Sequence, residues 1–247
     1  HQNRVSVMLK PQIWIHRGEF TGNMEMPTEE DWKKLEASYE KFILLYAKLA
    51  EETQTDIFCI GTELKTFVNE RPGFWNNLIQ KVRAVYTGKI TYAANWDEYA
   101  KIPFWAELDY IGVNAYFPLC EKQNPTIESL TQGWQPWKAK MHELAKQEDR
   151  PILFTEFGYR SMDFTGKKPW SVDRNQMDVN LKAQADATQV LFDEFWNEDW
   201  FAGGFVWKWF MQHDKVGGRE DNRFTPQNKP AESVIRSQYA QVKKSSL

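Results

Sequence analysis

Short apolar runs alternate with segments of helical spacing along the chain, and this alternation constrains the fold more than any other feature. The apolar runs lie at residues 4–10, 56–63, 89–96, 108–116, 151–158 and 202–209. The segments whose apolar residues recur every three or four positions lie at residues 28–46, 75–88, 137–147 and 179–197. Such alternation predicts parallel strands joined by crossover helices. No linker or low-complexity tract interrupts it, so we expect residues 1–247 to form one domain.

Two architectures accommodate six strands of this kind. A doubly wound open sheet gathers its functional residues at one switch point, whereas a (β/α)8 TIM barrel carries them at the carboxyl ends of many strands. Polar or aromatic residues end nearly every run, namely Lys10, Glu63, Asn95, Trp96, Asn114, Tyr116, Glu156 and Trp207. The pattern therefore favours an α/β fold of the barrel type from which the first two strand–helix units are absent. The stretch after residue 209 shows little periodicity and is predicted to be an irregular tail.

Two of the apolar runs end in a glutamate. Glu156 follows Ile152–Phe154, and Glu63 follows Ile57–Ile60. A charge buried at a strand end is costly unless it is used, and a retaining glycosidase needs two carboxyl groups about 5–5.5 Å apart. Glu63 and Glu156 are therefore the candidate catalytic pair. The alternative is that a buried basic residue, for instance Lys10 or Arg160, neutralises one or both of them; the residues alone leave both interpretations open.

Aromatic residues are abundant, with 12 Trp, 9 Tyr and 16 Phe. Most of them fit the core of a large α/β protein, but those at strand ends could stack on sugar rings. Trp207 follows a run that contains Gly203 and Gly204, which permit close approach of a ligand or of another backbone segment. Asn95 and Trp96 could line a cleft, or Trp96 could pack under the following loop.

Composition argues against several other classes of protein. The 31 basic and 34 acidic residues give a net charge of −3, so neither nucleic acid nor a membrane surface is an expected partner. No apolar run approaches the roughly 20 residues that span a bilayer. Cys59 lies in an apolar run and is expected to be a small buried hydrophobe, with a disulfide to Cys120 as the alternative. The 4 histidines lack ligand-like spacing, so we expect neither a metal nor a cofactor.

Several stretches together resemble the glycoside hydrolases of clan A, and more closely family 113, whose known members are retaining endo-β-1,4-mannanases. The matching stretches are residues 7–11, 58–64, 90–96, 108–119, 152–161, 204–209 and 229–232. The resemblance implies that the strands are the third to eighth of a barrel. It also implies that Glu63 is the acid/base, that Glu156 is the nucleophile, that Tyr116 hydrogen-bonds the nucleophile and that Trp207 is an aromatic platform under the sugar.

The sequence departs from this family pattern at two positions. Thr62 stands where clan A enzymes usually carry an asparagine that contacts the 2-hydroxyl, and Gln12 stands where a histidine is expected. Both departures bear on which sugar is bound, because the 2-hydroxyl is axial in mannose and equatorial in glucose. Lys10 is expected to pair with a carboxylate or to bind a sugar hydroxyl.

The expected protein is a single catalytic domain over residues 1–247, amino-terminally incomplete because the chain starts with His1 almost inside a strand. It would cleave a β-linked oligosaccharide or polysaccharide, with β-1,4-mannan as the leading substrate, as a monomer outside the cytoplasm. The alternatives are another clan A specificity, such as a β-glucan or a β-mannoside, or a carbohydrate-binding protein that kept the fold without turnover.

Overall fold

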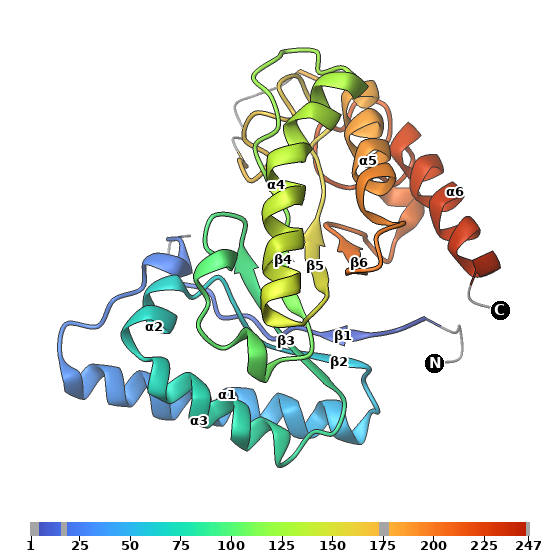
Figure 1. Ribbon diagram of the computed structural model, residues 1–247. Coiled ribbons are helices and arrows are strands. Elements are labelled where there is room, and N and C mark those ends of the chain that lie inside the picture. Colours follow the sequence, from blue (N-terminus) through green and yellow to red (C-terminus); the bar gives the residue numbers. More distant parts are fainter. Residues whose placement is uncertain (1–4, 16–18, 173–177, 246–247) are drawn as a thin grey trace. The chain divides into compact units, whose positions relative to one another are not determined.

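The computed structural model describes residues 5–15, 19–172 and 178–245 (Figure 1). The strands are β1 (Met8–Leu9), β2 (Ile57–Thr62), β3 (Lys89–Asn95), β4 (Ile111–Asn114), β5 (Ile152–Phe157) and β6 (Phe201–Val206). The α-helices are α1 (Glu29–Glu52), α2 (Lys65–Glu70), α3 (Pro72–Arg83), α4 (Ile127–Glu148), α5 (Leu181–Phe195) and α6 (Pro230–Ser245). Short 3-10 helices are η2 (Thr21–Asn23), η3 (Tyr99–Lys101), η4 (Trp105–Glu107) and η5 (His213–Lys215).

The six strands form one sheet in chain order, from β1 to β6. β1 pairs in parallel with β2, and β2 pairs in parallel with β3. Helices follow most of the strands, which is the strand–helix repeat of a (β/α)8 barrel with two units absent. The predicted fold class is therefore confirmed.

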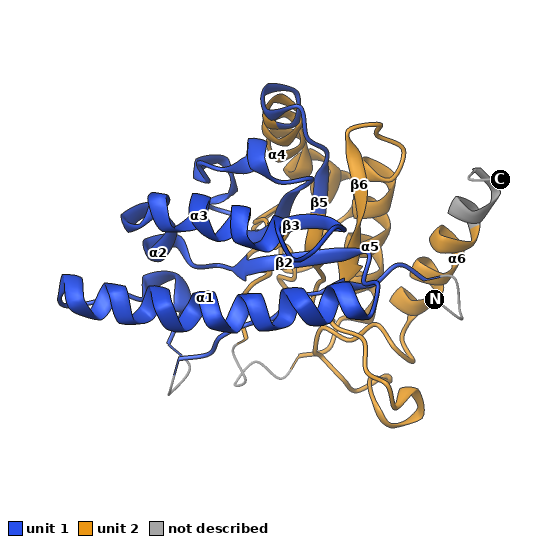
Figure 2. Ribbon diagram, turned by 90° about the horizontal axis from the view of Figure 1, so that it is seen from below, with its two compact units in different colours: residues 1–113, 145–153 blue, residues 114–144, 154–247 orange. Residues whose placement is uncertain are grey.

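The chain divides into two compact units, which Figure 2 colours separately. Unit 1 comprises residues 1–113 and 145–153, and unit 2 comprises residues 114–144 and 154–247. Unit 1 contains β1 to β3 and α1 to α3, whereas unit 2 contains α5, β6 and α6. Glu63 thus belongs to unit 1 and Glu156 to unit 2.

In unit 1 the first helix begins where the sequence predicts. The Thr28 side chain caps α1 by accepting a 3.1 Å hydrogen bond from the backbone N–H of Asp31. α1 lies beside α3 (Figure 1), and the Tyr39 hydroxyl of α1 donates to the carbonyl of Ile60 on β2 at 2.9 Å. The core of this unit is rich in buried rings, among them Tyr39, Phe67, Trp75, Tyr92, Phe104 and Trp105.

The helices of unit 1 differ from the sequence prediction in their bounds and in one additional helix. α3 ends at Arg83 rather than at Gly88, because the chain leaves the helix to bury Tyr86. The Tyr86 hydroxyl donates to the carbonyl of Thr55 at 2.7 Å, which satisfies the polar end of the buried ring. The short helix α2, directly after Glu63, was not predicted.

In unit 2, α4 starts ten residues before the predicted helix around residues 137–147. A reciprocal cap explains the start: the Thr126 N–H donates to the Ser129 Oγ at 3.0 Å, and the Ser129 N–H donates to the Thr126 Oγ1 at 3.2 Å. Pro136 lies inside the helix without ending it. Gly133 lets α4 approach the preceding loop, because a Cβ there would lie 2.2 Å from the carbonyl oxygen of Leu119.

The end of the chain also differs from the prediction, which placed an irregular tail after residue 209. α6 occupies residues 230–245 and lies beside α5 (Figure 1). It begins at a proline, which suits the first turn of a helix, and it buries Ala231 and Ile235. β6 ends at Val206, so Trp207 follows the strand instead of lying within it.

Candidate active site

Glu156 lies on β5, every residue of which is buried. Glu156 is only 8% exposed, and its backbone carbonyl accepts a 2.7 Å hydrogen bond from the N–H of Ala115. Tyr116, which is 7% exposed, donates its hydroxyl to the Glu156 Oε2 at 2.7 Å. This hydroxyl donor fixes the orientation of the carboxylate. The structure therefore brings together two of the predicted site residues.

Asn114 ends β4 close to the same place but has a packing role of its own. It is 1% exposed, and its Oδ1 accepts a 2.9 Å hydrogen bond from the Oγ1 of Thr155, the residue before Glu156. This bond ties the end of β4 to the end of β5. It fixes the amide plane of Asn114, so that any donation to a ligand comes from the amide nitrogen.

Trp207 lies just beyond β6 and is held against the end of β5. Its backbone N–H donates to the carbonyl of Phe157 at 2.7 Å, and the residue is half-buried. A Cβ on Gly158 would lie 2.1 Å from the Trp207 carbonyl oxygen, so only glycine allows this approach. The Lys208 ammonium lies 5.5 Å from the centre of the Trp207 ring.

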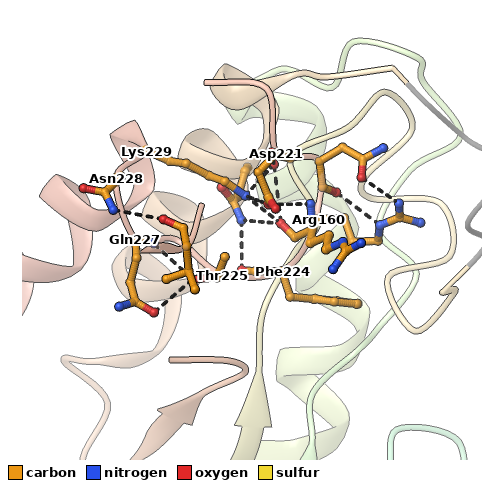
Figure 3. Close-up of polar contacts among 12 residues, drawn as sticks. Arg160, Asp221, Phe224, Thr225, Gln227, Asn228 and Lys229 are labelled. Carbon is orange, nitrogen blue, oxygen red and sulfur yellow. Dashed lines mark hydrogen bonds and ion pairs between the residues drawn. The ribbon is translucent and has the colours of Figure 1, made fainter. Parts of the chain in front are cut away.

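A buried lysine that the sequence interpretation missed organises the segment after β6 (Figure 3). The side chain of Lys229 is fully buried, and its Nζ contacts the Asp221 Oδ1 at 2.6 Å. The same Nζ donates to the Ser161 Oγ and to the Arg223 carbonyl, both at 2.9 Å. Burial lowers the pKa of Lys229, while the Asp221 carboxylate opposes that shift. Lys229 thereby ties the loop after β5 to the start of α6.

Two further side chains secure the same segment. Gln184 of α5 is 1% exposed and donates its amide to the carbonyls of Tyr159 at 2.8 Å and Phe224 at 3.0 Å. Arg160 donates to the backbone carbonyl and the Oδ1 of Asn222, both at 3.2 Å (Figure 3). The ring of Phe224 lies edge-on to Tyr116, the donor to Glu156, with 6.0 Å between ring centres. The packing around Tyr116, which donates to the Glu156 carboxylate, therefore includes Phe224, a residue far from it in the sequence.

Glu63 lies directly after β2 in unit 1 and is half-buried. Its backbone adopts the left-handed region, with φ of 51°, which is uncommon for a residue other than glycine. Its N–H donates to the carbonyl of Ala93 on β3 at 2.9 Å. The next N–H, that of Leu64, donates to the Tyr92 hydroxyl at 2.7 Å. Two bonds to β3 thus hold the turn that carries Glu63.

The end of β3 forms a tight turn around a carboxylate that the sequence interpretation did not single out. The Glu98 Oε1 accepts a 2.9 Å hydrogen bond from the N–H of Asn95, and the Asn95 Oδ1 accepts one from the N–H of Trp96 at 2.9 Å. Asn95 and Trp96 are half-buried, whereas Glu98 is 2% exposed. Burial is the largest cause that raises the pKa of Glu98 to about 7; the bond from Asn95 lowers it, and the nearby Glu63 charge raises it.

Lys10, which follows β1, interacts electrostatically with Cys59 on β2. Lys10 is half-buried just after β1, and its positive charge lowers the pKa of the Cys59 thiol. Burial outweighs this effect and raises the pKa of that thiol. Cys59 is buried, and both Cys59 and Cys120 are free thiols. Cys59 is therefore a small buried hydrophobe, as the sequence predicts.

Two findings concern only the residues that the structure describes. They contain no group of three or more His, Cys, Asp or Glu side chains placed to hold a metal ion. None of the helices in these ranges is both long enough and apolar enough to cross a membrane.

A (β/α)8-type sheet with a buried carboxylate at a strand end is an arrangement that glycoside hydrolases of the barrel class use. The model of Glycoside Hydrolase Family 113 matches residues 1–229. The chain therefore belongs to glycoside hydrolase family 113. A comparison with curated protein sequences gives no significant match.

Solved structures with the same fold include enzymes of this family. A family 113 β-1,4-mannanase is 27% identical with a TM-score of 0.82, over 97% of this chain and 75% of that chain. The family 113 β-mannanase AaManA from Alicyclobacillus acidocaldarius, in complex with ManMIm, is 27% identical with a TM-score of 0.82, over 96% and 73% of the two chains. A β-glucuronidase from Ruminococcus gnavus, 14% identical with a TM-score of 0.63 over 87% and 37%, shares the fold alone.

Proposed function

We propose that this chain cleaves β-1,4-linked mannan or manno-oligosaccharides with retention of anomeric configuration, using Glu156 as nucleophile and Glu63 as acid/base. The observation that carries the proposal is the 2.7 Å hydrogen bond from the Tyr116 hydroxyl to the buried Glu156 carboxylate. It orients one oxygen of a carboxylate held on a strand, and such positioning is what a nucleophile needs.

The proposed reaction proceeds in two displacements. Glu63 protonates the glycosidic oxygen while Glu156 attacks the anomeric carbon, which breaks the glycosidic bond and forms a glycosyl ester. Glu63, now ionised, takes a proton from water, and the resulting oxygen nucleophile displaces Glu156 from the anomeric carbon. The scheme requires the two carboxyl groups to come within about 5–5.5 Å of each other.

Mannan is the proposed substrate because two solved family 113 enzymes at 27% identity are described as β-mannanases. Trp207 would supply the aromatic platform under the sugar at the cleaved bond. The remaining contacts to sugar hydroxyls are assigned to Lys10, Asn95, Trp96 and Asn114. Thr62 is the position at which a change of preference toward glucose would be sought.

The test uses wild type, Glu63→Ala and Glu156→Ala with mannohexaose, cello-oligosaccharides and glucomannan. Proton NMR of the first product follows the anomer, and retention on mannosides, lost in both variants, is the expected outcome. Added azide then separates the roles, because azide replaces the missing carboxylate. Glu156→Ala should give an α-mannosyl azide and Glu63→Ala a β-mannosyl azide. An inverted product from the wild type would contradict the retaining mechanism. Cleavage of glucosides alone would contradict the assignment of mannan as substrate. Oligosaccharide binding without turnover would contradict the hydrolase function itself.

A further inference from the structure

The segment directly after Trp207 exposes two aromatic rings that the proposed reaction does not use. Trp209 is 49% exposed, and Phe210 is 37% exposed. A single exposed ring needs no explanation, but adjacent exposed rings on one loop are a feature of binding surfaces. The functional question is therefore which ligand these rings would contact.

The backbone that carries the rings is fixed by a buried amide. The N–H of Phe210 donates to the Gln227 Oε1 at 2.6 Å, and the Gln227 Nε2 donates to the carbonyl of Phe210 at 2.9 Å. Gln227 is fully buried, and its Oε1 also accepts from the Thr225 Oγ1 at 3.1 Å (Figure 3). The loop therefore presents its side chains in a defined place, so little ordering is needed when a ligand binds.

The far end of the same loop is held as well. The Asn228 Nδ2 donates to the carbonyl of His213 at 2.8 Å, and the His213 Nε2 contacts the Glu232 Oε1 at 2.8 Å. The ring centres of His213 and Trp209 lie 6.2 Å apart. Trp209 thus lies beside an anchored side chain, although about half of it remains exposed.

Lys208 connects these rings to the proposed sugar platform. Its ammonium group lies 4.8 Å from the centre of the Phe210 ring and 5.5 Å from the centre of the Trp207 ring. Trp207 in turn is held against β5 by its backbone bond to Phe157, the residue after Glu156. The exposed rings therefore continue from the site proposed for the cleaved bond. An aromatic face beside a hydrogen-bond donor suits a sugar, which has both apolar C–H faces and hydroxyl groups.

We propose that Trp209 and Phe210 form a second sugar-binding surface, which holds units of the β-linked chain beyond the one that stacks on Trp207. The inference rests on the proposed hydrolase function, and it makes this loop a determinant of the preferred chain length. A long substrate gains contacts with the two rings, whereas a substrate too short to reach them does not. The enzyme should therefore prefer long oligosaccharides to short ones.

Kinetics of Trp209→Ala on mannotriose and mannohexaose test this inference. The ratio of kcat/KM on mannohexaose to kcat/KM on mannotriose should fall by about 3- to 10-fold, because one aromatic stacking partner is lost, and Trp209→Phe should restore most of it. Met211→Ala is the matched control, because Met211 is fully exposed in the same loop but carries no ring. An unchanged ratio in Trp209→Ala, or the same fall in Met211→Ala, overturns the inference.

Direct binding separates this inference from the proposed function. Calorimetric titration with mannohexaose compares Glu156→Ala with the double variant that also carries Trp209→Ala, and the double variant should bind about 3- to 10-fold more weakly. Equal affinities overturn the inference even in an active mannanase. Weaker binding by the double variant, in a protein whose wild type cleaves no glycan, supports the second surface and rejects the hydrolase function instead.

Sedimentation velocity tests the competing occupant, a second copy of this chain. The wild type and Trp209→Ala should sediment alike at all concentrations. Self-association of the wild type that Trp209→Ala abolishes would assign the rings to an interface between copies and overturn the inference.

Discussion

The same sequence pattern, an apolar strand that ends in glutamate, produces two different environments in this molecule. Glu156 lies within an ordinary strand, is 8% exposed and accepts a hydrogen bond from Tyr116. Glu63 lies past its strand in a left-handed turn, is half-buried and has Glu98 as an electrostatic neighbour. One carboxylate thus accepts a hydrogen bond from a tyrosine, and the charge of the other raises the pKa of a second carboxyl group.

This difference teaches that the pattern locates a carboxylate and its surroundings decide what it can do. The Tyr116 hydroxyl fixes the orientation of one Glu156 oxygen, which suits a nucleophile. On the Glu63 side, burial and the Glu63 charge raise the pKa of the neighbouring Glu98. Two glutamates that follow the same sequence pattern therefore have chemically different surroundings.

The largest expected effect concerns the framework behind Glu156. Lys229→Met should lower the free energy of unfolding by about 3 kcal/mol, because it leaves the Asp221 carboxylate and two other acceptors without their buried donor. Lys182→Met removes an exposed ion pair with Asp186 in the same unit and should change stability by less than about 0.5 kcal/mol. Urea unfolding measures both. Equal effects would show that the buried cluster contributes no more than a surface pair.

A nearly equal effect, on the Glu63 side, depends on pH. The pKa of Glu98 is raised to about 7 from an ordinary 4.5, so the folded chain holds a proton that the unfolded chain releases. Stability should therefore fall as pH rises from about 4.5 to about 7, by at most about 3 kcal/mol at 1.36 kcal/mol per pKa unit. Unfolding curves at pH 5 and pH 8 should differ by that much more in wild type than in Glu98→Gln. The exposed Glu30→Gln should keep the wild-type pH dependence, and identical behaviour of all three proteins would refute the shift.

The strand ends could be predicted from sequence because their signals are local. An apolar run followed by Glu63 or Glu156 is visible within eight residues, and so is the strand–helix repeat that sets the fold. The start of α4 also had a local signal, the pair Thr126 and Ser129, which the prediction of a helix over residues 137–147 did not use. α6 carried the spacing Ala231, Ile235 and Tyr239, which is helical but brief.

The support around the site could not be predicted in this way. Lys229 contacts Ser161 across 68 residues of sequence, and no local pattern relates the two. The left-handed backbone of Glu63 cannot be predicted from residue type, because glutamate is not favoured in that region. Glu98 in a turn suggests a solvated charge, whereas the structure buries it. Burial and long-range partners are properties of the fold, not of a window of sequence.

A smaller effect separates two tyrosines that serve the two carboxylates differently. Tyr116→Phe removes the donor to Glu156 and should lower kcat/KM on mannohexaose by roughly 10- to 100-fold, about 1.4–2.7 kcal/mol. Tyr92→Phe instead removes the acceptor for the buried Leu64 N–H and should cost about 1–2 kcal/mol of stability, with a smaller effect on rate. Kinetics and urea unfolding of both variants check the contrast. The contrast is contradicted if Tyr116→Phe lowers stability without lowering kcat/KM.

The smallest effect tests the backbone beneath each carboxylate. A residue other than glycine in the left-handed region is strained by about 1 kcal/mol, so Glu63→Gly should be more stable than Glu63→Ala by about that amount. At Glu156, in an ordinary strand, the order should reverse, with Ala more stable than Gly by about 0.5–1 kcal/mol. Both comparisons cancel the loss of the carboxylate itself, so urea unfolding of the four variants isolates the backbone term. The same order at both positions would mean that the turn at Glu63 relaxes without the side chain, and that the carboxylate itself maintains the left-handed backbone.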